Sequence, residues 1–220
     1  MADFKKRKTN PTHEDLVAKI QAQAPGNLEL IKVFTEIRRE SFVPDQAKPL
    51  AHLDQPIEIP CDQTTSQPTL IALMIDSLHL RGSEKVLEIG TGYGYQTALL
   101  ARLCKHVYSI ERHPELTEGA RTHLEKYKIR NVTFVSGDGT LGLPHYAPYD
   151  AIIGSAAIAA VPKPVADQLS EGGVLVHPIG PGGEEWVIVF HKKNGIIVET
   201  TRLTRASFVR MIGTHGHRSS

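Results

Sequence analysis

Three glycines at alternate positions, Gly90, Gly92 and Gly94, directly follow the apolar segment 86–89. That segment is typical of a short strand buried on both faces, and the residues after Gly94 are typical of a helix. Glycine adopts positive φ angles readily and lets a ligand come close to the backbone. A helix that begins at such a turn points its amino end at the ligand. The spacing therefore predicts a strand, a ligand-binding turn and a helix.

Acidic residues accompany the ends of three predicted strands. Glu88 lies in the segment before the glycines, and Glu111 ends a second strand at 107–111. Asp138 follows a third strand at 132–136. A carboxylate at the tip of the second strand is placed to hold the two hydroxyls of a ribose. Acids and glycines at three strand ends predict one nucleoside-binding edge of a parallel sheet.

The glycine spacing favours one cofactor class over another. A dinucleotide-binding fold requires G-x-G-x-x-G, in which the third glycine lets the helix pack closely on the strand. Here the spacing is G-x-G-x-G, and Tyr95 stands where the dinucleotide motif has glycine. With Glu88 before it, this form resembles the first motif of S-adenosylmethionine-dependent methyltransferases of the Rossmann-like class. In that class, an acid placed like Asp138 contacts the adenine amine.

The rest of the chain must position this edge. Two helices are expected within 11–40, followed by a proline-containing loop that ends near residue 60. An irregular segment of that length inside a domain is usually functional. Asn194-Gly195 predicts a hairpin between the last two strands. Other expected elements are helices from Pro68 and at 114–126 and 162–169, and strands at 149–153, 174–177, 186–191 and 196–203.

These elements predict an α/β fold, a Rossmann-like class I methyltransferase. The sheet would be mostly parallel and seven-stranded, with an antiparallel C-terminal hairpin whose last strand runs opposite to the rest, and with added N-terminal helices. We expect one domain at 11–212, divided into helices and an active-site loop (11–67) and a cofactor-binding core (68–212). A flexible basic N-terminus (1–10) and a flexible tail (213–220) would flank it.

Composition excludes several classes of function. A chain of 220 residues, 40% of them hydrophobic, is large enough for one α/β domain. Its formal net charge of +1 creates no strong field for nucleic acid or an acidic membrane surface. It contains no membrane-spanning apolar run and no signal-peptide core, and Cys61 and Cys104 make no disulfide framework. The histidines lack the spacing of zinc ligands, so we expect no metal. From the charge, the apolar runs and the cysteines together, we expect a cytoplasmic protein without a membrane partner or a nucleic-acid partner.

A second motif identifies a family. The segment 62–68 reads D-Q-T-T-S-Q-P and is similar to the G-Q-T-I-S-x-P motif of the protein-L-isoaspartate (D-aspartate) O-methyltransferase family. The glycine turn follows it, and further matching segments occur in the family's order, among them 137–139, 147–152 and 172–173. The resemblance spans about residues 28–212.

The resemblance implies an S-adenosyl-L-methionine-dependent carboxyl O-methyltransferase. Its substrates would be L-isoaspartyl and D-aspartyl residues of damaged peptides and proteins, whose repair it would begin. The resemblance also implies a monomer, and it gives the active-site role to Ser66. Implied cofactor contacts are Glu88, Gly90, Thr91, Gly92, Gly94, Gln96, Glu111, Arg112, Asp138 and Gly139. Implied substrate contacts are Asp62, Gln63, Thr64, Thr65, Ala156 and Ala157.

The chain departs from the family's pattern at three places. Asp62 replaces the glycine before Gln-Thr, and Glu171 replaces the proline before a glycine pair. Arg210 and Met211 stand where the family has Pro-Leu. A carboxylate at Asp62 would either repel an anionic substrate or face solvent. These departures bear on the substrate and leave the predicted cofactor site intact.

A carboxylate acceptor makes modest chemical demands. Its pKa of about 4 leaves it ionised at pH 7, so methyl transfer needs alignment and exclusion of water, and no strong base. Ser66 can donate one hydrogen bond and hold that carboxylate in line. No His or Asp beside it indicates a catalytic triad. The alternative role for Ser66 is that of a cap on the helix that begins at Pro68.

Two other functions stay open at this stage. A methyltransferase of the same fold could act on another peptide or on a natural-product carboxylate, as Asp62 and the altered segment at 208–211 suggest. A protein of a different class, a non-catalytic cofactor-binding module, could use the same fold for recognition. The intact cofactor residues argue against that second alternative.

Overall fold

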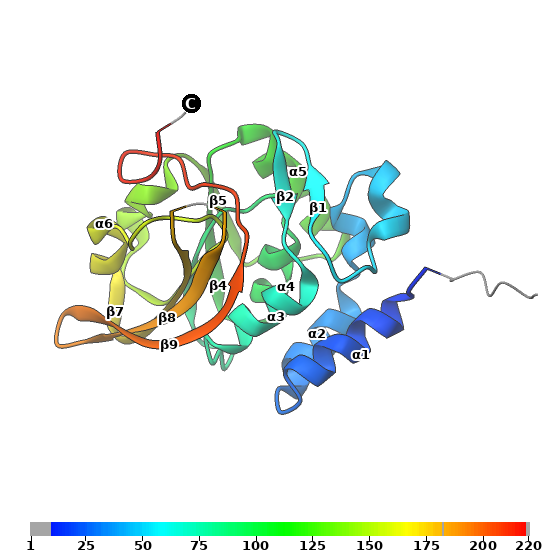
Figure 1. Cartoon of the computed structure of the whole chain (residues 1–220), viewed down its shortest axis with the longest axis horizontal. Coiled ribbons are helices and arrows are strands. Elements are labelled where there is room, and N and C mark those ends of the chain that lie inside the picture. Colours follow the sequence, from blue (N-terminus) through cyan, green and yellow to red (C-terminus); the bar gives the residue numbers. More distant parts are fainter. Residues whose placement is uncertain (1–9, 182, 219–220) are drawn as a thin grey trace, which may run out of the picture.

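The computed structural model describes residues 10–181 and 183–218. A seven-stranded sheet has the order β5-β4-β3-β6-β7-β8-β9, and a separate hairpin, β1-β2, stands beside it (Figure 1). Residues 1–9 of the predicted basic N-terminus lie outside the described residues. The strands are β1 (Ile57–Ile59), β2 (Gln63–Thr65), β3 (Lys85–Ile89), β4 (His106–Glu111), β5 (Val132–Ser136), β6 (Tyr149–Gly154), β7 (Leu169–Ile179), β8 (Glu185–Lys193) and β9 (Ile196–Ala206).

The sheet confirms the predicted α/β class. β3, β4, β5, β6 and β7 pair in parallel, whereas β8 and β9 each pair antiparallel to the strand before them. The C-terminal hairpin is therefore confirmed. The strand that runs opposite to the rest is β8, and the expectation that the last strand would do so is wrong. Two successive antiparallel pairings restore the original direction in β9.

Alternate residues of the central strands point to two different apolar cores. Val86 and Val107 share one core with α1, α2, α3 and α4, and Leu87 and Ile89 share the other with α6 and the C-terminal segment. No helix in the described part of the chain is long and apolar enough to cross a membrane. The helices are α1 (His13–Gln23), α2 (Leu28–Glu36), α3 (Pro68–Asp76), α4 (Tyr95–Leu103), α5 (Pro114–Lys126) and α6 (Lys163–Asp167), with the short 3₁₀ helices η1 (Arg39–Phe42), η2 (Asp45–Leu50), η3 (Gly139–Leu141) and η4 (Pro144–Tyr146).

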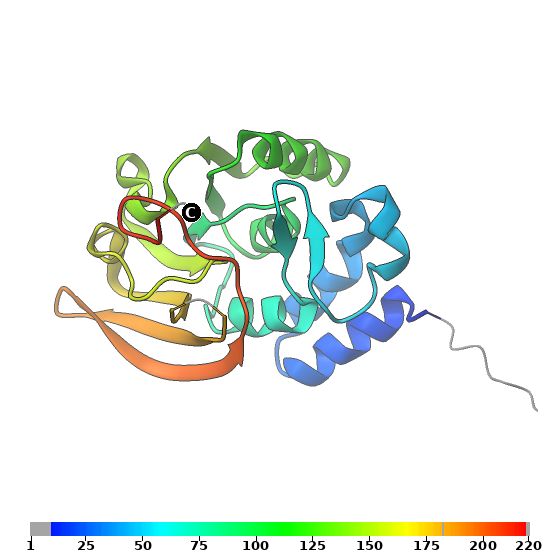
Figure 2. The same ribbon diagram turned by 45° about the horizontal axis from the view of Figure 1, so that its top comes forward.

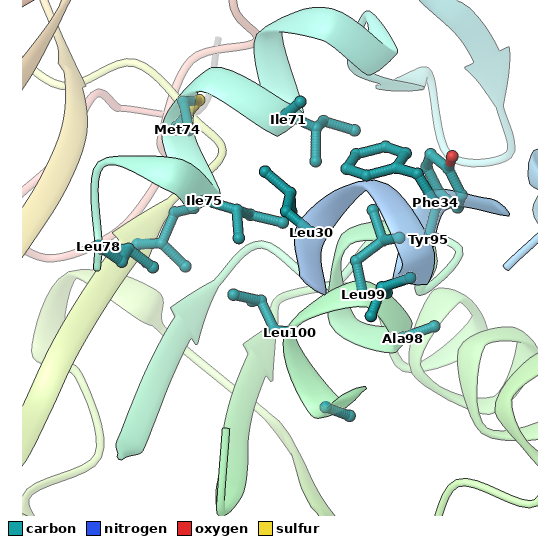
Figure 3. Packing of buried hydrophobic residues seen from close by; sticks show 14 of the residues in the cluster. Leu30, Phe34, Ile71, Met74, Ile75, Leu78, Tyr95, Ala98, Leu99 and Leu100 are labelled. Atoms are coloured by element: carbon teal, nitrogen blue, oxygen red, sulfur yellow. The ribbon is translucent and has the colours of Figure 1, made fainter. Parts of the chain in front are cut away.

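The two N-terminal helices are packed against the core and are not a separate unit. The Asn27 side chain accepts a hydrogen bond at the start of α2 and donates one to Asp76 at the end of α3 (2.8 Å). Figure 3 shows Leu30 of α2 among side chains that include Ile71 of α3 and Leu99 of α4. These contacts fix the position of the segment that follows α2.

The proline-containing segment before residue 60 has regular structure. It forms η1, η2 and β1, and β1 pairs with β2 in the register Ile57↔Thr65. No periodic pattern reveals these elements in the sequence, because η1 has four residues, η2 six and β1 three. The β1–β2 hairpin carries the motif 62–68 to the edge of the sheet.

The chain crosses that same edge again after β9 (Figure 2). We call residues 207–212 the C-terminal strap. Ala157 fixes it, since its N–H donates to the Val209 carbonyl (2.7 Å) and its carbonyl accepts from the Met211 N–H (2.8 Å). Residues 213–217 then lie on the loop after β5, where the Thr214 N–H donates to the Asp138 carboxylate (2.7 Å). Backbone hydrogen bonds thus hold the described part of the segment expected to be a flexible tail.

Candidate active site

A pocket opens at the carboxyl edge of β3 and β4, beside the glycine turn. Three separate parts of the chain build its wall: the ends of the strands, the β1–β2 hairpin and the C-terminal strap. We call it the glycine-turn pocket. Its lining residues are Gln63, Thr64, Ile89, Gly90, Gly92, Ile110, Glu111, Arg112, Gly139, Ser155, Ala156, Val209, Arg210, Met211 and Ile212.

The three glycines of the turn have two different tasks. Gly90 and Gly92 line the pocket with φ angles of +97° and +54°. Gly94 (φ +87°) does not line it, and a Cβ there would lie 2.9 Å from the Cβ of Ala120 on α5. The first two glycines therefore expose backbone to a ligand, and the third allows the turn to pack against a neighbouring helix.

Among the described residues, Glu111 is the one carboxylate in the wall of this pocket. Its Oε2 accepts a hydrogen bond from the Gly92 N–H, and its Oε1 accepts one from the His113 N–H, both at 3.0 Å. Each carboxylate oxygen has a second lone pair, so the anchored group can still accept two hydrogen bonds from a diol. This is the geometry predicted for holding a ribose at the tip of β4.

Glu88 lies behind the pocket and is completely buried. Its carboxylate accepts hydrogen bonds from Gln96 (3.1 Å), Thr97 (2.5 Å) and Ser109 (2.6 Å). Burial raises the pKa of Glu88 to about 7, although the three donors act in the opposite direction. Glu88 thus ties β3 to α4 and β4 beneath the turn and does not line the pocket.

Four other implied cofactor residues also lie outside the pocket lining. Gln96 donates to both Glu88 (3.1 Å) and Ser155 (2.9 Å), and the Thr91 hydroxyl is bonded to that of Ser109 (2.5 Å). The Asp138 carboxylate already accepts hydrogen bonds from Thr140 and Thr214. Partial burial raises the pKa of Asp138, but these hydrogen bonds outweigh it and lower the pKa to about 2. Together with Gly94, these side chains support the loops that form the wall. Of the implied cofactor contacts, Gly90, Gly92, Glu111, Arg112 and Gly139 line the pocket.

Ser66 lines a second pocket that adjoins the first. Thr64, Ser155 and Val209 line both pockets and form the boundary between them. We call the second pocket the Ser66 pocket. The described residues that line it provide hydroxyl and amide groups and a single arginine. Its lining residues are Pro56, Thr64, Ser66, Gln67, Leu70, Ser155, Arg205, Ala206, Ser207, Phe208 and Val209.

A fully buried arginine holds the backbone at Ser66. The guanidinium of Arg39 donates to the carbonyls of Leu53 (3.0 Å), Gln55 (2.9 Å) and Ser66 (3.1 Å), with longer bonds to Ala51 and Thr65 (3.4 Å each). Burial lowers the pKa of Arg39 to about 10, which leaves it charged at neutral pH. Carbonyl oxygens from two segments therefore share one cation, and that cation fixes their relative position.

The start of α3 is stabilised by a residue outside the helix. Asp54 accepts hydrogen bonds from the Thr69 N–H (3.0 Å), the Thr69 hydroxyl (2.9 Å) and the Gln67 amide (3.0 Å). The helix cap is Gln67, whose side chain makes no capping hydrogen bond. Because Asp54 supplies the negative charge that this helix end favours, Ser66 is not needed as a cap.

Two departures from the family's pattern have local structural explanations. Asp62 has a φ of +55°, a left-handed conformation that suits glycine and that aspartate tolerates better than most residues. It lies in the hairpin turn and lines neither pocket. The Glu171 carboxylate accepts hydrogen bonds from the backbone of Asn194 (2.6 Å) and Gly195 (3.1 Å), and it thereby supports the β8–β9 turn.

Of the remaining implied substrate residues, three line the glycine-turn pocket and two are buried behind the site. Gln63, Thr64 and Ala156 line the glycine-turn pocket. Thr65 and Ala157 are buried; Thr65 gives its carbonyl to Arg39, and Ala157 anchors the strap.

His177 of β7 is fully buried against Gly154 and lines neither pocket. Burial lowers its pKa to about 4, so it is neutral at pH 7. Its position indicates a packing role.

Sequence reasoning missed two groups of wall residues. Ile89 and Ile110 end β3 and β4, so their place at the carboxyl edge could have been read from the predicted strand ends. Ser155 directly follows β6 and carries the same signal. The strap residues Val209, Arg210, Met211 and Ile212 have no such signal, because only the folded chain brings them to the glycine turn.

The lining of the glycine-turn pocket fits S-adenosylmethionine. Ile110, Met211 and Ile212 provide apolar contacts suited to an adenine ring, next to the Glu111 carboxylate suited to a ribose diol. At Gly139 a Cβ would lie 2.6 Å from the Cγ2 of Ile89, so the backbone approaches the strand more closely than another residue would allow.

Comparison with known proteins identifies the family. A family model described as protein-L-isoaspartate(D-aspartate) O-methyltransferase matches residues 11–216. The chain belongs to this family. It is an S-adenosylmethionine-dependent methyltransferase, and the match includes the N-terminal helices as well as the sheet.

Relatives match this methyltransferase along most of its length. A protein-L-isoaspartate O-methyltransferase of Dictyoglomus turgidum is 40% identical over 214 residues, 97% of each chain. One from Myxococcus xanthus is 42% identical over 187 residues, 84% of this chain and 88% of the relative. A solved protein-L-isoaspartate O-methyltransferase has a TM-score of 0.82 and 30% identity over 93% of this chain and 67% of its own. A Plasmodium falciparum structure solved with S-adenosyl-L-homocysteine (TM-score 0.79, 21% identity, 92% of this chain and 99% of that one) shares the fold.

The buried Glu88 should make the stability of this methyltransferase fall as pH rises. Its pKa is about 7 in the folded chain and 4.5 for the ordinary side chain, so the folded state keeps the proton longer. The stabilisation is complete below pH 4.5 and is lost as pH rises through 7, about 3 kcal/mol in all. In urea unfolding at pH 5 and pH 8, Glu88→Gln should remove this part of the pH dependence. Parallel pH profiles for the two proteins would contradict the assignment.

Arg39→Lys should impair catalysis while leaving the cofactor half of the site intact. Lysine keeps the charge but cannot reach carbonyls in two segments, so the backbone at Ser66 would shift and stability would fall by about 3 kcal/mol. We expect kcat to fall at least about tenfold while S-adenosylhomocysteine affinity, measured by calorimetry, changes less than about twofold. Equal losses in kcat and affinity would mean general unfolding, and an unchanged kcat would show that Arg39 does not position Ser66.

Proposed function

We propose that this enzyme methylates the free carboxylate of L-isoaspartyl and D-aspartyl residues in peptides and proteins, with Ser66 as the residue that orients the acceptor. The observation that carries the proposal is the shared wall between the two pockets. Thr64, Ser155 and Val209 line both, so a carboxylate beside Ser66 lies next to a cofactor in the glycine-turn pocket. Family membership supports the same acceptor.

Alignment and exclusion of water are the tasks left to the protein. Bound S-adenosylmethionine supplies an electrophilic methyl group on a positively charged sulfur. A carboxylate is already ionised at pH 7, so the site needs no general base. Ser66 donates a hydrogen bond to one carboxylate oxygen and turns the other toward the cofactor pocket. The strap and the β1–β2 hairpin close the junction from two sides and limit the access of water.

We propose that a single copy is sufficient for activity, as the resemblance to the family implies. The net charge of +1 supports protein and peptide substrates over nucleic acid. The free thiols of Cys61 and Cys104 support a cytoplasmic enzyme, because thiols stay reduced there.

Methyl transfer from labelled S-adenosylmethionine to two matched peptides tests the function. One peptide contains L-isoaspartate and the other L-aspartate at the same position. We expect base-labile label on the isoaspartyl peptide alone. Label on neither, with cofactor binding intact, would overturn the proposed acceptor and favour another carboxylate.

Ser66→Ala should lower kcat/KM for the isoaspartyl peptide by about 10- to 100-fold, because a hydrogen bond to a charged group contributes about 1.5–3 kcal/mol. Cofactor affinity should not change. Ser207→Ala is the matched control, since Ser207 lines the same pocket but gives its hydroxyl to the Gly183 carbonyl. Wild-type kinetics in Ser66→Ala, or equal losses in both variants, would rule out the orienting role.

A further inference from the structure

The Ser66 pocket has one positively charged side chain in its lining, that of Arg205. No carboxylate among the described residues lines this pocket. Arg205 is near the carboxyl end of β9, just before the strap, so it lies at the same edge of the sheet as Ser66. The proposed acceptor is itself an anion, and a cation in the same pocket therefore bears on which acceptors bind.

The structure fixes the position of the Arg205 guanidinium. Arg205 is the cross-strand partner of Trp186 on β8, and its guanidinium lies 5.5 Å from the centre of the indole. It also forms an ion pair with Glu184 (3.0 Å). Stacking on an aromatic face holds an arginine in place, so less conformational freedom is lost when it binds an anion.

The ion pair with Glu184 is exposed and exchangeable. The side chains of Arg205 and Glu184 are 51% and 59% exposed. Exposed pairs of this kind contribute little free energy, because water screens both charges. A carboxylate on a bound peptide can therefore replace Glu184 or share the guanidinium with it.

We propose that Arg205 is a specificity-determining residue that selects isoaspartyl peptides carrying a second carboxylate close to the acceptor. The inference rests on the proposed function. An extended peptide advances about 3.3–3.6 Å per residue, so an acidic residue one or two positions from the isoaspartate stays within the same pocket. Glu184 is the competing anion in the chain itself, and the preference should increase when it is neutralised.

Arg202 provides a matched control on the same strand. Its guanidinium lies 5.9 Å from the centre of the same indole and pairs with Glu199 (2.6 Å), as Arg205 does with Glu184. Arg202 does not line the Ser66 pocket. Arg202→Gln and Arg205→Gln thus remove the same charge from the same Trp186 stack, and they differ in whether the lost cation faces the acceptor.

The experiment compares two isoaspartyl peptides that differ only in Glu or Gln one residue from the isoaspartate, and a second pair that differs two residues away. For the wild type at low salt, kcat/KM should favour the Glu peptide by about three- to fivefold at one of these positions. Arg205→Gln should abolish the preference, so that the Glu and Gln peptides have equal kcat/KM. Arg202→Gln should keep the preference, and Glu184→Gln should increase it. About 0.3 M salt should weaken it in the wild type.

Three results would overturn the proposal: no preference in either pair, a preference that survives Arg205→Gln, or equal losses in the two arginine variants. The last would indicate a general effect of net charge. Failure of the proposed function has a different signature, because then neither isoaspartyl peptide would be methylated by the wild type at any salt concentration.

Discussion

The geometry of the site depends on a single buried cation. Arg39 has no carboxylate within hydrogen-bonding distance among the described residues, and its charge is stabilised by the carbonyl dipoles of residues 51–55 and 65–66. Taking a guanidinium out of water is costly, and the carbonyl oxygens replace the lost hydration. Moving any of these carbonyls away would therefore destabilise the buried cation, so their positions are fixed. Since Arg39 follows α2, the packing of the N-terminal helices on α3 and α4 helps to set the position of the backbone at Ser66.

Much of the fold follows from local patterns, because apolar strand segments, glycine turns and the Asn194-Gly195 hairpin leave clear traces in sequence. The site was predictable where it is formed at strand ends, as with Glu111 and the glycines. It was not predictable where hydrogen bonds within the protein decide a residue's role. Glu88 and Asp138 have the residue type expected of ligand contacts, yet their carboxylates are taken up by neighbouring hydroxyl and backbone donors. Sequence does not show which carboxylates are already bonded.

The departures from the family's pattern illustrate the same limit. From its charge alone, Asp62 suggests repulsion of an anionic substrate. Its φ of +55° shows instead that it is a turn residue. Glu171 is similarly explained by the turn that it supports. Of the three departures, the change at Arg210 is the one that lies in the wall of a pocket. A substitution near a motif therefore bears on specificity only when its side chain or backbone reaches the ligand.

The strap lies far along the chain from the other walls that it completes. Both pockets have Val209 as a wall residue, and the strap that contains it follows β9 and is anchored by Ala157. Both pockets are therefore incomplete without a segment that is not part of the sheet. A single proteolytic cut beyond Ala206 would leave nearly the whole sheet in place and yet open both pockets to solvent. Loss of this short segment alone would thus remove a wall from both pockets of the enzyme while most of its fold stayed intact.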